Sequence, residues 1–288
     1  MDKGIKSVFM AGIFLLLSLF PCPSGAQGVK KLSVFVTIPP QAYFVNKICA
    51  DRCLVHVLIP AHMSPHAYEP SPRQVALLSE AQAYFTIGVP AEDALLGRIK
   101  ILNRNMVIIP AQAGVETRPM ENLSGHAGPD PHIWLDPQRV KIIAQNIHWA
   151  LVRLAPEAED AFSHQLRLFL GELDRVDGQI RRLLAPLKGK KMYVFHPSFG
   201  YFTDAYGLKQ VPIEREGKEP PPKYLAKIIA EARKDRVTAL FVQPQFSPKG
   251  AQAIADAIGA HLVFLDPLAY DYTNNLLKIA ISIRENLK

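Results

Sequence analysis

Three histidines and one aspartate stand where side chains can do chemistry: His66, His132, His196 and Asp266. Three imidazoles and one carboxylate form a tetrahedral donor set that suits a borderline metal ion such as Zn²⁺. A single histidine is more often a hydrogen-bonded structural residue than a metal ligand. Two of these four residues fall in each half of the chain, and this joint placement predicts a metal site between the halves.

The elements that must position these residues can be read from the alternation of apolar and amphipathic segments. His66 lies in the loop after a predicted strand, His196 and Asp266 end predicted strands, and His132 sits in a proline-bounded loop before a predicted helix. Strands that alternate with helices predict an α/β fold with mainly parallel sheets flanked by helices. In such open sheets, ligands bind at the carboxyl ends of the strands.

Two short segments recur at a nearly constant distance along the chain. Residues 36–39 (VTIP) match 194–197 (VFHP), and residues 107–111 (VIIPA) match 264–268 (FLDPL). The matched prolines are 158 positions apart in the first pair (39 to 197) and 157 in the second (110 to 267). This repeat predicts two similar lobes, at residues 27–155 and 188–288. In the second lobe, a histidine and an aspartate replace two isoleucines of the first.

Residues 156–187 predict one long helix that joins the two lobes. Its apolar residues recur at steps of four and three, which keeps them on one helix face. They are Phe162, Leu166, Phe169, Leu173, Val176, Ile180 and Leu183. Roughly 29 residues at about 1.5 Å each give a rod near 43 Å long. A coiled coil is the alternative, but no partner repeat exists elsewhere in the chain.

Residues 1–26 have the pattern of a secretory signal peptide. Two lysines precede an apolar run from Val8 to Phe20, and small residues follow up to Ala26. This pattern predicts export to the periplasm and cleavage after Ala26. Cys22 raises lipid anchoring as an alternative. The residue before a lipidated cysteine is normally small, whereas Pro21 stands here, so the sequence favours an unanchored protein.

The remaining cysteines and the charges bound the function further. Cys49 and Cys53 would stay in the mature protein, where either a disulfide or two buried thiols is compatible with their spacing. The formal net charge is +7, but the basic residues are scattered, and the densest short run is residues 188–191. A solvated surface explains that run, so no nucleic-acid partner is expected.

Five motifs in this order resemble the solute-binding proteins of bacterial zinc and manganese ABC transporters, the metal-binding cluster A-I family. They are Ser64–Pro72, Asp130–Pro137, His196–Tyr201, Glu216–Pro220 and Leu265–Leu268. The resemblance covers the whole mature chain. It implies two lobes joined by one long helix, with the metal held between them by His66, His132, His196 and Asp266. It further implies a monomer that carries a divalent ion to a membrane permease.

The third of these ligands bears on the choice of metal. Members of that family with glutamate there tend to bind manganese, and those with histidine tend to bind zinc. His196 therefore favours Zn²⁺, with Mn²⁺ as the alternative. Replacing His196 with alanine is expected to weaken zinc binding while the metal-free fold keeps its stability. His62 and His126 are candidates for transient or second-site ligands.

Two functions of other classes compete with metal carriage. Three histidines can hold a catalytic zinc with an open fourth position, as in a metal-dependent hydrolase. However, Asp266 would close that position, and no His-Glu-x-x-His helix is present. The resemblance also admits a surface adhesin, which the weak lipidation signal disfavours. The sequence therefore predicts a metal carrier and no enzyme.

Overall fold

The structure is a computed structural model that describes Met1 and residues 31–63, 68–120, 128–214 and 221–287. His66, His126, the predicted signal peptide after Met1 and the motif at 216–220 lie outside the described residues. The chain divides into two compact units, Met1–Lys30 and Lys31–Lys288. Everything that follows concerns the second unit.

The second unit contains two parallel four-stranded sheets. The N-lobe sheet has the order β2-β1-β3-β4 and the C-lobe sheet has the order β6-β5-β7-β8. The strands are β1 (Leu32–Val36), β2 (Cys53–Val57), β3 (Ala83–Thr86), β4 (Val107–Pro110), β5 (Lys191–Val194), β6 (Lys209–Pro212), β7 (Ala239–Val242) and β8 (His261–Phe264). The same order in both sheets confirms two similarly built lobes, because β1 corresponds to β5 and β4 to β8, as the sequence repeat predicts.

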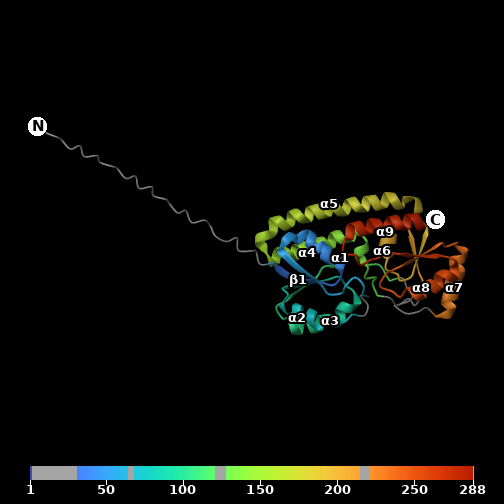
Figure 1. Ribbon diagram of the computed structural model, residues 1–288, viewed down its shortest axis with the longest axis horizontal. Helices are drawn as coiled ribbons and strands as arrows, with labels where there is room; N and C mark the ends of the chain where they lie inside the picture. Colours follow the sequence, from blue (N-terminus) through green and yellow to red (C-terminus); the bar gives the residue numbers. More distant parts are fainter. Residues whose placement is uncertain (2–30, 64–67, 121–127, 215–220, 288) are drawn as a thin grey trace. The chain divides into compact units, whose positions relative to one another are not determined.

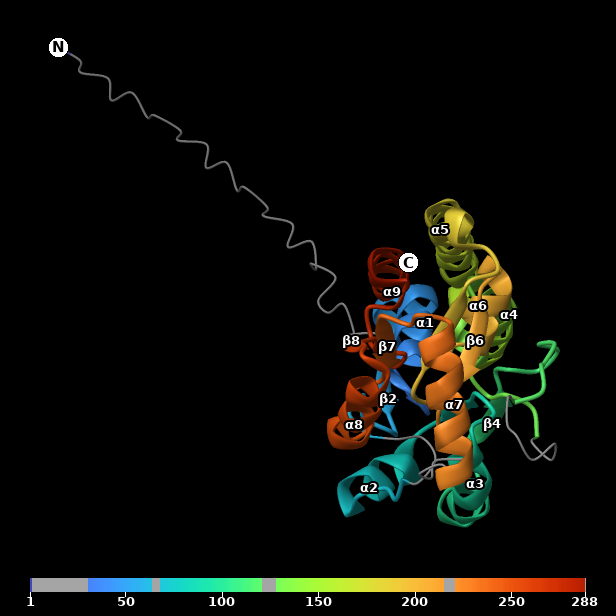
Figure 2. The ribbon, with the colours of Figure 1, turned by 90° about the vertical axis from the view of Figure 1, so that its right-hand side faces the viewer.

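Helices cover both faces of each sheet (Figures 1 and 2). They are α1 (Pro39–Cys49), α2 (Pro72–Glu80), α3 (Pro90–Leu102), α4 (Pro137–Leu154), α5 (Glu159–Leu184), α6 (Gly200–Tyr206), α7 (Pro222–Lys234), α8 (Pro248–Ile258) and α9 (Tyr272–Asn286). On the N-lobe sheet, α2 and α3 lie on one face and α1 and α4 on the other. On the C-lobe sheet, α7 and α8 lie opposite α6 and α9.

Successive strand residues supply the two faces of each sheet. Phe35 of β1 packs in the cluster under α2 and α3, whereas its neighbour Val34 belongs to the large core on the α5 side. In the C-lobe, Tyr193 packs under α7 and α8, and Val194 joins the same large core. Both faces are apolar because a parallel sheet with helices on each side is buried on each side. The large core runs through both lobes.

The long helix lies where the sequence predicts it. α5 has 26 residues, and 3₁₀ turns at Pro156–Ala158 and Ala185–Leu187 extend it at either end. It packs against α1, α4 and α9, so its partners come from both lobes (Figure 1). The predicted apolar stripe is buried at Phe162, Phe169, Leu173, Val176 and Ile180. The other two residues of the stripe, Leu166 and Leu183, are only partly buried.

Two further α5 residues are buried that the apolar pattern does not include, Leu184 and Asp177. The Asp177 carboxylate accepts a hydrogen bond from Tyr206 Oη of α6 at 3.0 Å and one from Gln138 Nε2 of α4 at 3.2 Å. It also pairs with Arg181 one helical turn later. These partners explain why a charged residue is tolerated on the buried face of α5.

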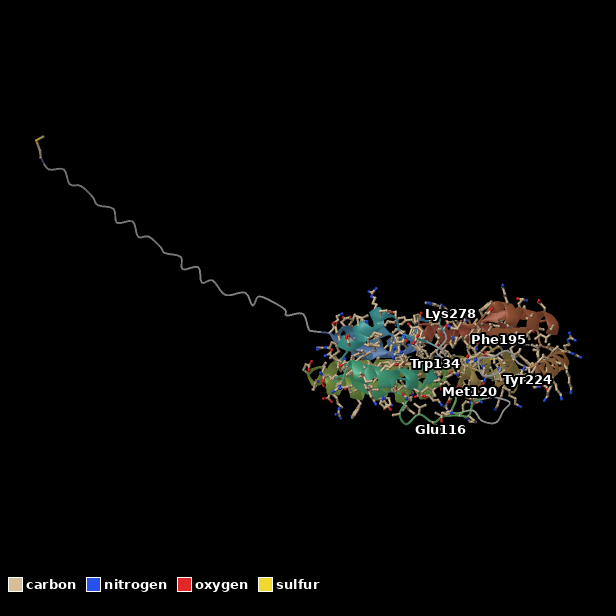
Figure 3. The ribbon with its side chains drawn as sticks, turned by 90° about the horizontal axis from the view of Figure 1, so that it is seen from below. Glu116, Met120, Trp134, Phe195, Tyr224 and Lys278 are labelled. Carbon is tan, nitrogen blue, oxygen red and sulfur yellow. A yellow bond between two sulfur atoms is a disulfide. The ribbon has the colours of Figure 1, made fainter. Side chains whose placement is uncertain are left out.

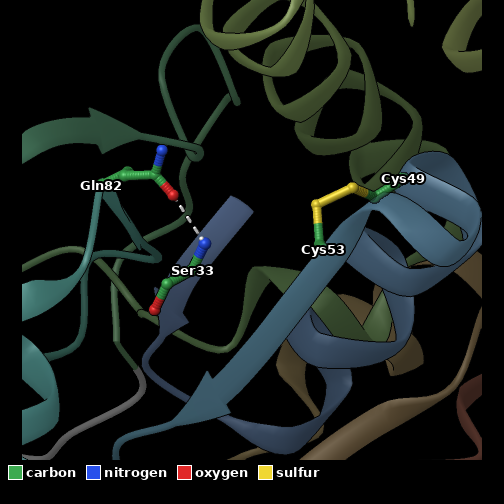
Figure 4. Close-up of a disulfide and its surroundings, with 4 residues drawn as sticks. All are labelled: Ser33, Cys49, Cys53 and Gln82. Atoms are coloured by element: carbon green, nitrogen blue, oxygen red, sulfur yellow. Dashed lines mark hydrogen bonds between the residues drawn. A yellow bond between two sulfur atoms is a disulfide. The ribbon is translucent and has the colours of Figure 1, made fainter. Parts of the chain in front are cut away.

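Cys49 and Cys53 form a disulfide, with their Cα atoms 5.9 Å apart (Figure 4). Cys49 ends α1, Cys53 begins β2, and a 3₁₀ turn, Ala50–Arg52, lies between them. This turn is the local unwinding that a bridge across three residues requires. Of the two alternatives that the sequence leaves open, the structure has the disulfide.

In the described part of the chain, no helix is long and apolar enough to cross a membrane.

Candidate metal site between the lobes

His132 lies just before the turn Ile133–Leu135 that leads into α4, and Asp136 caps that helix by accepting from Gln138 N at 2.9 Å. The imidazole is buried, 5% exposed. Asp130 Oδ1 accepts from the backbone N of His132 at 3.0 Å and lies 2.8 Å from its Nδ1. One carboxylate oxygen of Asp130 therefore both caps the loop and holds the His132 ring.

The other Asp130 oxygen, Oδ2, lies 3.3 Å from Arg118 Nη1. The Asp130 side chain is fully buried, and the backbone carbonyl of Asp130 accepts a hydrogen bond from Tyr201 Oη at 2.7 Å. Arg118 Nη1 and the backbone N of His132 hold the buried carboxylate in one orientation, and the carboxylate holds the imidazole in turn. Asp130 thus places His132 through contacts to both lobes, since Tyr201 belongs to α6.

His196 lies two residues beyond β5 and is 3% exposed. Its Nδ1 lies 3.1 Å from Glu214 Oε2, and Glu214 follows β6, the neighbouring strand. Gln243, which follows β7, donates from Nε2 to the His196 carbonyl at 2.7 Å and accepts from the His196 backbone N at 3.3 Å. Phe246 stacks on the ring at 4.7 Å between centroids. Residues that follow β6 and β7, the two strands that flank β5, therefore hold His196 in place.

The His132 and His196 rings meet across the lobe junction, with centroids 5.3 Å apart. Each has a carboxylate at Nδ1, an arrangement that leaves Nε2 as the nitrogen suited to a metal ion. Burial lowers the pKa of His196, although its hydrogen bond to Glu214 works in the opposite direction. The ring is therefore neutral at physiological pH, which is the form that binds metal.

Asp266 lies two residues beyond β8, and its Oδ1 accepts from Leu268 N and from Gln245 Nε2, both at 2.9 Å. The next residue, Pro267, offers its carbonyl to Trp134 Nε1 at 2.8 Å. This bond ties the Asp266 segment to the His132 segment, and Trp134 lies where the two lobes meet (Figure 3). The Trp134 ring also lies 5.3 Å from the His132 ring.

The structure therefore joins His132 to His196 by ring contact and to Asp266 through neighbouring residues. His66, the remaining predicted ligand, lies outside the described residues. Within the described ranges, no three His, Cys, Asp or Glu side chains are gathered closely enough to hold a metal ion. His62 is exposed on the N-lobe loop.

The remaining described histidines have ordinary surroundings. His56 stacks on Phe35, His148 Nε2 lies 2.9 Å from Ser163 Oγ, and His261 Nε2 lies 2.8 Å from Asn286 Oδ1. His164 is exposed on α5. The ring contact of His56 and the hydrogen bonds of His148 and His261 are those of structural residues.

Sequence reasoning missed Glu214 and the β7–α8 loop, Gln243–Phe246. This loop bonds the backbone of His196, stacks on its ring and bonds Asp266. Both segments follow strands, so they fall at the carboxyl edge where ligands bind, but only the strand order shows that they lie beside His196.

Comparison with known proteins places this geometry in a family. The family model for zinc-uptake complex component A, periplasmic (ZnuA), matches residues 34–286. The high-affinity zinc uptake system protein ZnuA of Bacillus subtilis is 28% identical over 259 residues, which cover 83% of this chain and 79% of that protein. The manganese ABC transporter substrate-binding lipoprotein PsaA of Streptococcus pneumoniae is 26% identical over 269 residues, covering 88% and 86%.

A solved structure agrees in fold. The crystal structure of a ZnuA deletion mutant with zinc bound is 41% identical and superimposes with a TM-score of 0.85, covering 90% of this chain and 99% of that one. The likeness includes both sheets and the long helix that packs against both lobes. The chain belongs to the ZnuA family, the periplasmic A components of zinc-uptake complexes.

Proposed function

We propose that this protein captures one Zn²⁺ ion in the periplasm and delivers it to the membrane permease of an ABC transporter. The observation that carries the proposal is the pair of buried imidazoles, His132 and His196, which meet at 5.3 Å across the lobe junction. A carboxylate at each Nδ1 orients the rings and raises their basicity toward a metal ion. The family membership supports the same function.

The proposed ligands are His66, His132, His196 and Asp266. Asp266 is supported by the Trp134–Pro267 bond, which ties its segment to His132. Three imidazoles favour Zn²⁺, and Mn²⁺ remains the second candidate, since a manganese-transporter component is among the relatives. Four protein ligands leave no open position for a substrate water, so the proposed role is carriage and not hydrolysis.

We further propose that residues 1–26 direct export and are removed without lipid anchoring at Cys22. The mature chain then consists of the lobes at 27–155 and 188–288 and the linking helix at 156–187, and it acts as a monomer that binds no nucleic acid. The disulfide supports an oxidising compartment, because such bonds persist there.

The test is a zinc titration of the purified mature chain against a chelating competitor. We expect one ion per chain, bound more tightly than Mn²⁺. His132→Ala and His196→Ala should each weaken binding by more than the tenfold to hundredfold loss that is typical of an outer hydrogen-bond partner. The exposed His164→Ala is the matched control. Unchanged stoichiometry and affinity in both ligand variants would refute the assignment.

A further inference from the structure

The β7–α8 loop reaches across the lobe junction through Gln245. Its side-chain Nε2 donates to Asp266 Oδ1 at 2.9 Å and to the carbonyl of Ala61 at 2.6 Å. Ala61 belongs to the N-lobe, 184 positions earlier in the chain. One amide nitrogen therefore connects a C-lobe carboxylate to the N-lobe loop that follows β2.

The oxygen of the same amide is unusual. Among the described residues, two buried side-chain atoms have no hydrogen-bond partner, Gln245 Oε1 and Glu214 Oε1. A buried acceptor without a donor costs about 1–3 kcal/mol, so native structures hold few of them. Both side chains contact proposed zinc ligands, Asp266 and His196 respectively. The unsatisfied acceptors are thus concentrated at the metal site.

The contacts of Asp266 suggest what the amide nitrogen does. The carboxylate receives both of its N–H donors, Gln245 Nε2 and Leu268 N, on Oδ1. Within the described part of the chain, no donor is bound to Oδ2. Two donors on one oxygen set the plane of the carboxylate and leave the other oxygen to ligate an ion with a single bond.

We propose that Gln245 is a positioning residue for zinc. Its amide nitrogen orients Asp266 so that Oδ2 faces the ion, and the same nitrogen ties the N-lobe loop at Ala61 to this carboxylate. This inference rests on the proposed function, because it takes Asp266 as a ligand.

A double-mutant cycle tests whether Gln245 acts through Asp266. The variants are Gln245→Met, which keeps the side-chain length but removes the N–H donors, Asp266→Ala and the double variant. Gln252→Ala, on the exposed face of α8, is the matched control. The probe is Zn²⁺ alone, titrated against a chelator, with urea unfolding of each metal-free variant to confirm that it folds.

Gln245→Met should weaken zinc binding by about tenfold to a hundredfold, the range for partners that orient a metal ligand. The same substitution should have no effect when Asp266 is already alanine. Unchanged affinity in Gln245→Met, or an equal loss in both backgrounds, would overturn the inference while the ligand set stands. If Asp266→Ala binds zinc like the parent protein, Asp266 is no ligand, and the role of Gln245 falls with it.

Hydrogen exchange tests the contact across the junction. The amide of Met63 bonds the Pro60 carbonyl at 3.0 Å, so it reports on the loop around Ala61. Zinc should slow exchange of this amide in the parent protein, and that protection should be lost in Gln245→Met. Equal protection in both proteins would show that the N-lobe loop is not coupled to the ion through Gln245.

Discussion

Replacing His196 with alanine should destabilise the metal-free protein, contrary to what the sequence suggests. The imidazole is 3% exposed, and its Nδ1 is the partner of Glu214 Oε2, while Glu214 Oε1 has no hydrogen-bond partner among the described residues. Without the ring, no described residue donates to either oxygen of this carboxylate, which is 5% exposed. Removing one member of a buried charged pair costs about 3–5 kcal/mol. Because the histidine is neutral, we expect the lower end, about 3 kcal/mol at pH 7.

Urea unfolding of chelator-treated protein, followed by circular dichroism, measures this loss. A second substitution, Glu214→Ala, removes the stranded carboxylate, so the double variant should recover about 2 kcal/mol relative to additivity. The exposed His164→Ala should change the unfolding free energy by less than about 0.5 kcal/mol. A loss below that value in His196→Ala, or additive effects of the two substitutions, would contradict the interpretation that Glu214 depends on His196.

Three further predictions concern pH and covalent structure. Zinc affinity should fall on acidification only below about pH 6.5, the ordinary pKa of histidine, because burial lowers the pKa of His196 and keeps its ring neutral above that pH. A zinc affinity that stays constant down to about pH 5 would contradict this prediction. Glu172→Gln should cost about 1–2 kcal/mol at pH 7: burial raises the pKa of this carboxyl, but hydrogen bonds from Lys47, Thr273 and Tyr43 outweigh it and lower the pKa. That contribution is present above the ordinary glutamate pKa and is lost as the pH falls through the lowered pKa of the folded state, so the difference between parent and variant should shrink on acidification in denaturant titrations. Reducing the Cys49–Cys53 disulfide should lower the unfolding free energy by about 2 kcal/mol, as expected for so short a loop, and an unchanged denaturation midpoint would exclude this.

Local patterns were enough to predict the fold because each element carries its own signal. Asp136 and Pro137 begin α4 in the structure, after the proline-bounded loop where the sequence predicts a helix. The repeat correctly matched β5 and β8, which precede His196 and Asp266, to β1 and β4 of the other sheet. The apolar stripe of α5 is buried as predicted at five of its seven positions, and Leu166 and Leu183 are only partly buried. Steps of three and four from Ile180 reach either Leu183 or Leu184, and tertiary packing buries the second.

The partners of the site could not be predicted in the same way. Glu214, Gln243 and Gln245 act through side-chain hydrogen bonds whose partners are 18 to 184 positions away in the chain. Glutamines in a loop usually indicate a solvated surface, and only the sheet order shows that these lie beside His196. Asp177 was missed for a related reason, since its burial depends on partners in α4 and α6.

The polar contacts of α5 have a consequence for how a transporter could recognise this protein. Glu172 binds Tyr43 and Lys47 of α1 and Thr273 of α9, while Asp177 binds side chains of α4 and α6. Two neighbouring turns of α5 thus hold the helix to elements of both lobes. A change in the angle between the lobes would have to break several of these contacts together. On the proposed function, a permease that distinguishes zinc-loaded from zinc-free protein would therefore recognise the surface around the proposed metal site, and not a change in the angle between the lobes.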